Sequence, residues 1–362
     1  MQHFHRLKIS KYRKETNDCT HISFEIPENL KHEFLFKQGQ YINVRFVFDG
    51  EDLRRSYSIV NAPSGGNSEL EILVKHIESG AVSKHLNQNV KLGDEIEVMP
   101  PQGHFFTNHH VSNQKKYVGI AAGSGISPVL SNIVEALNQE PKSNAYLFFG
   151  NRSFKDIIFR EKIDALAEKF SGRLKVIYLI SRERHSEDPL FEGRISAEKL
   201  DALFERFPEI PIRESTFFIC GPAEMIKEIS EHLKIDKKIP PLQVLYEYYS
   251  PPDDEDSAER SDEFKKIPNV ESFVTLIIDD DEYDFHLNSK KESILEKALK
   301  EELPVPFSCK GGVCCTCKAQ VIKGEVFMEK NYALTEDELA RGFVLSCQSH
   351  PITNVVTLSF DV

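Results

Sequence analysis

The sequence predicts a multidomain α/β and β protein: an antiparallel β-barrel, then a doubly wound parallel α/β domain, then a small β-rich C-terminal domain. Three observations predict this order. Apolar and polar residues alternate in the first hundred or so positions, short apolar runs are separated by stretches of helical length from about residue 115, and an acidic stretch precedes a cysteine-rich loop.

The first domain is expected over residues 1–110. Apolar side chains occupy every second position in much of 42–48 and 70–74, which is the period of a half-buried strand. Turn residues, such as the Ala-Pro-Ser-Gly-Gly segment at 62–66, separate these runs. Several short strands with this spacing indicate a closed antiparallel barrel.

The second domain is expected over residues 111–249. Short apolar runs of the kind that form buried parallel strands lie at Tyr117–Ala121, Ala145–Phe149, Leu174–Ile180 and Phe217–Cys220. Because segments of helical length separate them, the pattern predicts alternating strands and helices around a parallel sheet.

Residues 250–268 read as a solvated linker, because they combine prolines and a run of acids with almost no apolar residues. The last domain is expected over residues 269–362. It begins with a hairpin of 272–278 and 283–287, and the Ser-Ile-Leu-Glu segment at 293–296 has the form of a capping box that starts a helix.

Charge and composition exclude some function classes. The chain has 57 acidic and 45 basic residues and a formal charge of −12, so binding to nucleic acid or to an anionic membrane is not expected. No apolar run reaches the ~18 residues of a membrane span. The N-terminal segment lacks the apolar core of a secretory signal, and the seven cysteines suit metal binding in a reducing compartment, so we expect a cytoplasmic protein.

The cysteine loop carries the most specific signal. Cys309, Cys314 and Cys317 have C-x4-C-x2-C spacing, and Cys347 follows after 29 intervening residues. This is the spacing of a plant-type [2Fe–2S] site, in which four thiolates hold two irons. Glycines at 311 and 312 allow the backbone to pass close to the sulfurs and to turn its N–H groups toward them. A zinc site is the alternative, but only one C-x2-C pair is present.

A flavin site is predicted in the barrel. Arg55 can neutralise a diphosphate, Tyr57 can stack on an isoalloxazine face, and Ser58 can bond near its N5 atom. After a further strand, Gly80 permits close approach of the backbone, and Ser83 is expected to open a helix whose N-terminus faces the diphosphate. A structural strand without a ligand is the alternative, since R-x-Y-S alone is a weak pattern.

A nicotinamide nucleotide site is predicted at the ends of the parallel strands. Glycines at 123 and 125 allow a phosphate-approaching turn, with Ser127 as the helix N-cap and Pro128 at the first helical position. Cys220 ends a later strand, where its small side chain can lie beside the nicotinamide or can simply be a buried core cysteine. Arg152, Ser181 and Arg182 end two neighbouring strands. The arginines can bind a 2′-phosphate, and no acid stands at the usual position to bind a 2′-hydroxyl, so NADPH is favoured over NADH.

In this order, the segments RRSYSI, GAVS, AAGSGISP, GNRS, ICGPAEM and CKGGVCCTC resemble the ferredoxin–NADP reductase superfamily fused to a plant-type ferredoxin. The resemblance covers essentially the whole chain and implies a flavin-binding barrel, a nucleotide domain and a β-grasp ferredoxin domain. It departs from the family at Ser124, where Thr is common, and at Glu247-Tyr248-Tyr249, where Glu-Arg-Phe is usual. The implied FAD contacts are Arg55, Ser56, Tyr57, Ser58, Val74, Lys75, Gly80, Ala81, Val82, Ser83 and Glu247; the implied nicotinamide contacts are Gly123, Ser124, Gly125, Arg152, Ser181, Arg182, Cys220, Gly221 and Pro222; the implied cluster ligands are Cys309, Cys314, Cys317 and Cys347; Tyr57, Ser58 and Cys220 would lie at the reacting atoms.

The implied activity is electron transfer from NADPH through FAD and a [2Fe–2S] cluster to a separate oxygenase. GEDLRRSYSI, EVMPPQGHF and MEKNYALTEDELARGFVLSCQ resemble the reductase subunits of phenylacetyl-CoA epoxidases, which implies a multisubunit di-iron partner in phenylacetate degradation. Ketosteroid hydroxylase reductases share much of the last segment and remain an alternative. A redox sensor with the same cofactors but no turnover is another, although intact motifs at all three sites disfavour it. The electron-transfer subunit of dihydroorotate dehydrogenase is disfavoured by the long gap before Cys347.

Overall fold

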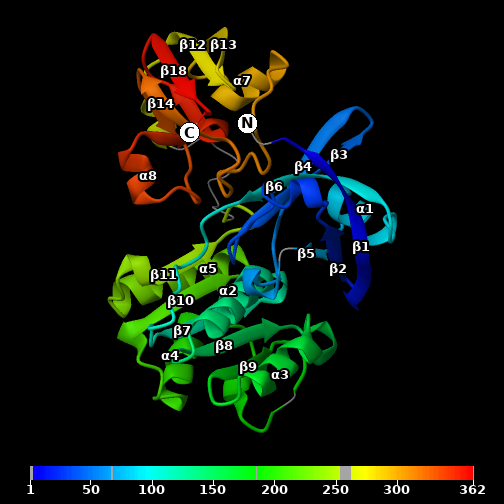
Figure 1. Cartoon of the computed structure of the whole chain (residues 1–362). Coiled ribbons are helices and arrows are strands. Elements are labelled where there is room, and N and C mark those ends of the chain that lie inside the picture. Colours follow the sequence, from blue (N-terminus) through cyan, green and yellow to red (C-terminus); the bar gives the residue numbers. More distant parts are fainter. Residues whose placement is uncertain (1–2, 67, 185, 253–261, 362) are drawn as a thin grey trace. The chain divides into compact units, whose positions relative to one another are not determined.

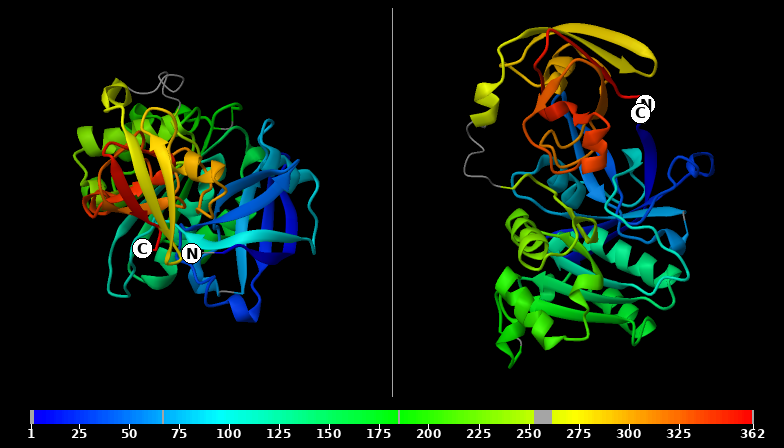
Figure 2. Two further views of the ribbon diagram at one scale, coloured as in Figure 1. Left: turned by 90° about the horizontal axis from the view of Figure 1, so that it is seen from above. Right: turned by 90° about the vertical axis from the view of Figure 1, so that its left-hand side faces the viewer.

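The structure is a computed structural model that describes residues 3–66, 68–184, 186–252 and 262–361 (Figures 1 and 2). Phe4–Asp52 and Tyr57–Tyr248 form one compact unit, and most of the remainder, from Tyr249 onward, forms another. The barrel and the parallel sheet therefore belong to the same unit, and the predicted division at residue 110 stays a prediction. Within the described ranges, no helix is both long and apolar enough to cross a bilayer.

The predicted antiparallel barrel is confirmed. Its strands are β1 (His5–Thr16), β2 (Cys19–Glu25), β3 (Tyr41–Phe48), β4 (Glu51–Ser58), β5 (Glu69–Lys75) and β6 (Glu95–Gln102), in the sheet order β4-β3-β6-β1-β2-β5. An antiparallel bridge between Ile59 and Ile72 connects the end of β4 to β5, so the first and last strands of the sheet meet. Short helical segments accompany the strands: η1 (Glu28–Leu30), η2 (Pro63–Gly65) and α1 (Ala81–Gln88).

The predicted doubly wound α/β sheet is also confirmed. Parallel strands β7 (Lys116–Ala122), β8 (Asn144–Asn151), β9 (Leu174–Ile180), β10 (Ser215–Cys220) and β11 (Val244–Glu247) lie in the order β11-β10-β7-β8-β9. The main helices are α2 (Ile126–Gln139), α3 (Arg160–Lys169), α4 (Ala197–Arg206) and α5 (Ala223–Glu231). A short π-helix, η7 (His232–Asp236), continues α5. Single 3₁₀ turns are η3 (Gly123–Gly125), η4 (Phe154–Asp156), η5 (Pro189–Phe191), η6 (Ile212–Glu214) and η8 (Pro241–Gln243). The strand order reverses between β7 and β10, and ligands of such sheets bind outside the strand ends at this reversal.

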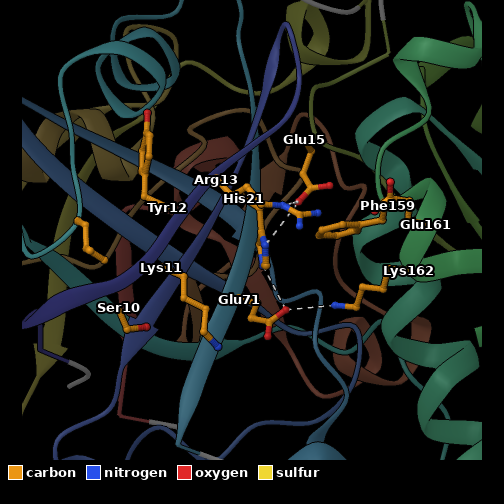
Figure 3. Close-up of a pocket in the computed structure, with 11 residues that line it drawn as sticks. Ser10, Lys11, Tyr12, Arg13, Glu15, His21, Glu71, Phe159, Glu161 and Lys162 are labelled. Carbon is orange, nitrogen blue, oxygen red and sulfur yellow. Dashed lines mark hydrogen bonds and ion pairs between the residues drawn. The ribbon is translucent and has the colours of Figure 1, made fainter. Parts of the chain in front are cut away.

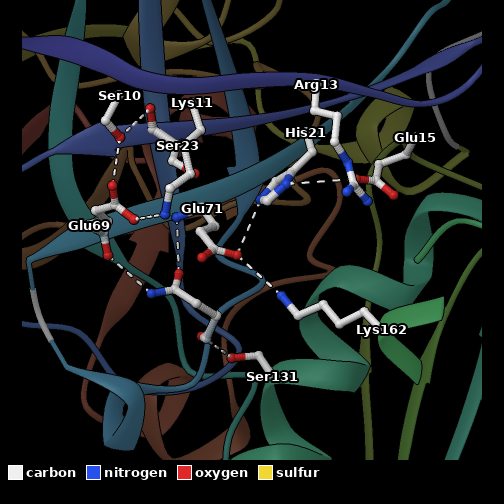
Figure 4. Close-up of polar contacts among 11 residues, drawn as sticks. Ser10, Lys11, Arg13, Glu15, His21, Ser23, Glu69, Glu71, Ser131 and Lys162 are labelled. Atoms are coloured by element: carbon white, nitrogen blue, oxygen red, sulfur yellow. Dashed lines mark hydrogen bonds and ion pairs between the residues drawn. The ribbon is translucent and has the colours of Figure 1, made fainter. Parts of the chain in front are cut away.

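Polar contacts join the barrel to the nucleotide domain. A cleft of about 710 Å³ lies between β1, β2 and α3, and Figure 3 shows Lys162 of α3 and Glu71 of β5 facing each other there. Lys162 Nζ lies 3.2 Å from the Glu71 carboxylate, and His21 on β2 contacts the same carboxylate at 3.2 Å (Figure 4). Arg13 is paired with Glu15 in the same cleft. Of these contacts, the Lys162–Glu71 ion pair joins the nucleotide domain to the barrel, whereas the His21–Glu71 and Arg13–Glu15 contacts lie within the barrel.

A buried carboxylate fixes the segment between the two domains. Glu140, at the end of α2, is fully buried and accepts hydrogen bonds from Tyr117 Oη (2.9 Å), Asn113 Nδ2 (2.6 Å) and Ser143 Oγ (2.7 Å). His109 Nδ1 lies 3.0 Å from it. Burial opposes its ionisation, but these hydrogen bonds outweigh burial and lower the pKa of Glu140. No sequence pattern indicates this group, because its partners are scattered over several elements and loops.

The C-terminal unit contains a five-stranded sheet in the order β13-β12-β18-β14-β16 and a two-stranded sheet of β15 and β17. Its elements are α6 (Asp262–Lys266), β12 (Glu271–Ile278), β13 (Asp281–Asn288), α7 (Ile294–Lys300), β14 (Lys318–Lys323), β15 (Val326–Met328), α8 (Glu336–Ala340), β16 (Phe343–Leu345), η9 (Ser346–Gln348), β17 (Ser349–Pro351) and β18 (Val355–Ser359). Ser293 and Glu296 form the predicted capping box of α7.

The predicted linker over 250–268 needs a correction at its end. Residues 262–266 form helix α6, and Phe264 is buried in a ring contact with His350 at 4.7 Å. The Phe264 side chain attaches this helical turn to the C-terminal unit, because its ring packs against the imidazole of His350. Residues 253–261, which carry most of the acidic run, lie outside the described residues.

We predict that Glu140→Gln lowers the free energy of unfolding by about 2–3 kcal/mol at neutral pH, since several donors face the carboxylate. Because the folded-state pKa is below the usual 4.5, the ionised form stabilises the fold above that pH. The difference between wild type and variant should therefore shrink as the pH falls below 4.5 through the folded pKa. Urea unfolding at several pH values measures this.

Glu209→Gln is the matched control, because Glu209 is an exposed acid in an ion pair with Lys175. Its loss should change stability by less than about 1 kcal/mol. An equal decrease in the free energy of unfolding in the two variants would show that the buried hydrogen bonds to Glu140 stabilise the fold no more than an exposed ion pair does.

Candidate functional site

The turn after β7 lies at the reversal of the strand order. Gly123, with φ of +54°, begins the 3₁₀ turn η3, which runs directly into α2 at Ile126. The prediction that Ser127 caps this helix is wrong: Ser127 lies inside the first turn, and its Oγ donates to the Ser124 carbonyl at 3.1 Å. The helix begins earlier because the glycine turn is itself helical. The positive end of α2 still opens onto the strand ends.

Gly125 contacts the end of β10 without any intervening side chain. A Cβ atom on Gly125 would lie 2.1 Å from the Cys220 carbonyl oxygen and 2.7 Å from the Gly221 nitrogen. Only glycine allows this approach, so the two predicted nucleotide segments are brought together by direct backbone packing. Pro222 follows as the N-cap of α5.

Cys220 lies in register with Ala121 on β7 and with Glu247 on β11. Its side chain is fully buried within the hydrophobic core of the nucleotide domain. The structure thus places Cys220 at the expected strand end, but with its thiol enclosed by neighbours. Contact between this thiol and a nicotinamide ring stays a prediction, and the alternative of a buried core cysteine fits its burial.

A hydrogen bond links the barrel to the end of β11. Ser58, the last residue of β4, donates from Oγ to Glu247 Oε2 at 2.8 Å. Burial raises the pKa of Glu247 to about 7, although the bond from Ser58 partly offsets it. A carboxyl group with this pKa exchanges its proton near neutral pH. Sequence reasoning named both residues but did not foresee that they contact each other.

The remaining predicted flavin residues lie on β4, β5 and the start of α1. The prediction that Ser83 opens this helix is wrong, because Gly80 is the N-cap and Ser83 lies in the first turn. Ser83 Oγ donates to the Gly80 carbonyl at 3.1 Å, and a Cβ on Gly80 would lie 2.6 Å from this oxygen. A side chain at position 80 would therefore force the Ser83 hydroxyl to move.

Other members of the predicted flavin set differ in exposure. The buried members are Val74 and Val82; Ser56 and Tyr57 are partly buried, and Arg55 and Ala81 are exposed. Lys75 ends β5, and its Nζ lies 3.4 Å from where a Cβ on Gly123 would be. This ammonium group connects the flavin strand to the glycine turn, where it can meet a phosphate.

Arg152 and Arg182 lie at the ends of β8 and β9, and the Arg182 N–H donates to the Arg152 carbonyl at 2.8 Å. The Arg152 side chain is engaged: its Nη2 lies 2.6 Å from Asp18 Oδ2 and its Nε lies 3.6 Å from Asp156. Two acids therefore already contact the arginine that was predicted to bind a 2′-phosphate. Asp18 was missed because it belongs to the barrel, in the turn between β1 and β2, and nothing in the sequence connects it to residue 152. Ser181 Oγ donates to the Asn151 carbonyl.

The four predicted cluster cysteines come together as two pairs. The Cys314 thiol donates to Cys309 Sγ at 3.1 Å, and Cys317 is hydrogen-bonded with Cys347. Among the described residues, no three His, Cys, Asp or Glu side chains surround a single point as one metal ion would need. Two thiolate pairs suit a centre with two irons, each of which takes two thiolates beside the bridging sulfides. The donor set therefore fits a [2Fe–2S] cluster better than zinc.

Backbone N–H groups favour thiolate at the first cysteine. The Gly311 N–H donates to Cys309 Sγ at 3.3 Å. The bond from Cys314 and the N–H groups of Gly311, Val313 and Cys314 outweigh burial and lower the pKa of Cys309 to about 6. Such donors stabilise the negative charge of a sulfur that binds iron.

The distant fourth cysteine is fixed to the loop through its neighbours. Ser346 Oγ donates to the Cys317 carbonyl at 3.0 Å, and Gln348 Nε2 donates to the Lys310 carbonyl at 3.1 Å. Cys315 is turned elsewhere: its thiol donates to the Ala333 carbonyl at 3.6 Å. Cys315 therefore packs as an ordinary thiol and is not a fifth member of the two cysteine pairs.

Comparison with known proteins agrees with these sites. Residues 6–107 match the description "Oxidoreductase FAD-binding domain", residues 120–231 "Oxidoreductase NAD-binding domain" and residues 277–351 "2Fe-2S iron-sulfur cluster binding domain". Fold and site together define an NAD(P)H-dependent iron–sulfur flavoprotein reductase, with binding domains for FAD, the nicotinamide nucleotide and a [2Fe–2S] cluster.

The chain is 38% identical to a subunit of the 1,2-phenylacetyl-CoA epoxidase of Escherichia coli (strain K12), over 100% of this chain and 99% of that protein. It is 28% identical to the ferredoxin reductase component of the 3-ketosteroid-9-alpha-monooxygenase of Rhodococcus rhodochrous, over 98% of this chain and 96% of that one. Phthalate dioxygenase reductase shares the fold with a TM-score of 0.57 at 21% identity, covering 99% of this chain and 98% of that one. The chain belongs to the ferredoxin–NADP reductase superfamily, in the branch fused to a plant-type ferredoxin domain that includes these oxygenase reductases.

We predict that Cys314→Ser abolishes the visible absorbance of the iron–sulfur cluster and the NADPH-driven reduction of cytochrome c. Reduction of ferricyanide, which accepts electrons from flavin directly, should persist. Absorbance spectra, iron and acid-labile sulfide assays and the two acceptor assays measure this.

Cys315→Ser is the matched control, because serine keeps a donor to the Ala333 carbonyl in the same loop. Its cluster content should equal that of wild type. Loss of the cluster in Cys315→Ser but not in Cys314→Ser would contradict the ligand assignment.

Proposed function

We propose that this reductase supplies electrons to a multisubunit di-iron epoxidase that acts on phenylacetyl-CoA. The observation that carries the proposal is the 38% identity to a phenylacetyl-CoA epoxidase component over essentially the full length of both chains, against 28% for the ketosteroid reductase. Because the identity extends over the flavin, nucleotide and iron–sulfur domains together, it supports the same electron-transfer role for both proteins. We propose that the reductase is a cytoplasmic protein, because NADPH is its electron donor and because free thiols persist in a reducing compartment.

We propose that hydride passes from NADPH to FAD where β4 meets the ends of β7, β10 and β11. When bound, FAD accepts electron pairs and releases them singly, and the cluster accepts one at a time. Gly123 and Gly125 would allow the nucleotide to approach, and the start of α2 would face its diphosphate. Tyr57 would cover the flavin ring, and the FAD diphosphate would lie between Arg55 and the start of α1.

Ser58 and Glu247 would hold or release a proton beside the flavin site, separately from the hydride, whose transfer needs no proton. Glu247 orients the Ser58 hydroxyl by accepting its hydrogen bond, and its pKa of about 7 allows it to hold or release a proton at physiological pH. The bond also fixes the end of β4 against the nucleotide sheet. The Glu247 carboxyl would thus orient the Ser58 hydroxyl toward the flavin site and exchange a proton there.

We predict that Glu247→Gln slows flavin reduction by up to about tenfold, because its neutral amide oxygen accepts the Ser58 hydrogen bond more weakly than a carboxylate does, a difference of at most roughly 1.4 kcal/mol. The wild-type rate should show an inflection near pH 7 that the variant lacks, since glutamine does not titrate. Anaerobic stopped-flow reduction between pH 5.5 and 8.5 measures both. Ser58→Ala should show the same slowing but should keep an inflection; an unchanged inflection in Glu247→Gln would contradict the assignment.

Reconstitution tests the proposed partner. The purified reductase, mixed with the oxygenase subunits of a phenylacetyl-CoA epoxidase, NADPH and phenylacetyl-CoA, should support product formation and matched NADPH consumption. A 3-ketosteroid oxygenase assayed in parallel with its steroid should turn over at least about tenfold more slowly, since docking specificity of this size needs only ~1.4 kcal/mol. Turnover with the steroid oxygenase and none with the epoxidase would overturn the proposal.

A further inference from the structure

Four charged groups meet where the barrel touches the ends of the nucleotide-domain strands. Asp18 Oδ2 lies 2.6 Å from Arg152 Nη2 and 3.8 Å from Lys75 Nζ. On the far side of the arginine, Asp156 Oδ2 lies 3.6 Å from Nε and also accepts a bond from Ser153 Oγ. We name Asp18, Lys75 and Arg152 the Asp18 cluster.

Asp18 is held in place by its own segment. Its carbonyl accepts the His76 N–H at 2.7 Å, and its Oδ1 accepts the Thr16 hydroxyl at 2.9 Å. Burial is outweighed by the charge of Lys75 and by bonds from Thr16 and Arg152, which lower the pKa of Asp18, so the group is ionised at neutral pH. A fixed negative charge therefore lies beside both cations.

These cations lie where a nicotinamide coenzyme would place its phosphates. Lys75 is beside Gly123 of the turn that leads into α2, and Arg152 follows the end of β8, next to the strand of the turn. In a doubly wound sheet the diphosphate lies at such a glycine turn, and the adenosine ribose lies over the next strand end. Arg152 has five N–H donors, of which Asp18 occupies one at hydrogen-bond distance.

We propose that Asp18 is a selectivity residue: its carboxylate occupies the cations in place of a coenzyme phosphate and so weakens binding of the 2′-phosphate that distinguishes NADPH from NADH. A phosphate that reaches Arg152 either displaces Asp18 or lies beside its negative charge, and each event opposes binding. NADH carries no group at this position, so it does not meet this opposition. The proposal rests on the proposed nicotinamide site.

The consequence for the reaction is a limit on how tightly the oxidised product is held. NADP⁺ keeps its 2′-phosphate, so the same carboxylate that opposes NADPH binding would also favour release of NADP⁺. A reductase whose coenzyme leaves readily exposes its flavin sooner to the next electron acceptor.

The test compares wild type with Asp18→Asn, which keeps the shape of the side chain but removes its charge. Calorimetric titration of the purified holoprotein with 2′,5′-ADP and with 5′-AMP measures the contribution of the 2′-phosphate without turnover. We expect Asp18→Asn to raise the affinity for 2′,5′-ADP relative to 5′-AMP by about three- to tenfold, the size of a partly exposed charge interaction. The ratio of kcat/KM for NADPH to that for NADH should rise in the same sense.

Two further variants assign the effect. Asp94→Asn removes a barrel carboxylate that accepts a bond from the Lys91 N–H and is not a member of the Asp18 cluster, so it should leave the affinity ratio unchanged. In an Arg152→Ala background, Asp18→Asn should raise the affinity ratio of 2′,5′-ADP to 5′-AMP by less than about twofold. The reason is that the arginine for which the carboxylate and the phosphate compete is then absent.

An unchanged or lowered affinity ratio in Asp18→Asn would overturn the proposal, as would an equal rise in Asp94→Asn or an undiminished rise in the Arg152→Ala background. Failure of the proposed function has a different signature. In that case neither NADPH nor NADH would bleach the wild-type flavin, whereas the nucleotide titrations would still report on Asp18.

Discussion

The attachment of the barrel to the carboxyl edge of the parallel sheet is the constraint on which the rest depends. Hydride transfer needs two rings in contact, and each ring is predicted to bind to a different domain. Contacts at several points fix the two domains: Ser58 with Glu247, Ser131 with Asn61, Asn132 with Phe105, Lys162 with Glu71, and Arg152 with Asp18. Because these bonds come from several barrel segments and several nucleotide-domain elements, no single contact decides the geometry.

The iron–sulfur site follows a different principle, because its geometry is local to the C-terminal unit. One loop supplies three cysteines, and hydrogen bonds from Ser346 and Gln348 hold the fourth against that loop. The N–H groups that point at Cys309 add stabilisation for negative charge. Plant-type clusters have potentials near about −400 mV, and such donors and burial are how a protein adjusts that value.

The order of the domains, most strands and the capping box of α7 were predictable, because periodicity, glycine turns and cysteine spacing are local signals. Helix starts at Ser83 and Ser127 were mispredicted, since in both places the helix begins at a glycine segment before the expected cap. The contacts of Glu140, and of Asp18 with Arg152, were not predictable. These contacts join residues far apart in sequence, and no local sequence pattern predicts which arginine an acid in a barrel turn will contact.

The central claim is that one chain carries electrons from a nicotinamide nucleotide through flavin to a [2Fe–2S] centre. Anaerobic addition of NADPH to the purified protein, followed by rapid-scan absorbance and freeze-quench electron paramagnetic resonance, tests it most directly. Flavin absorbance should bleach first, and the signal of a reduced [2Fe–2S] cluster should then grow at a matching rate. Flavin that bleaches while the cluster signal never appears, or a protein that shows neither change, would contradict the account.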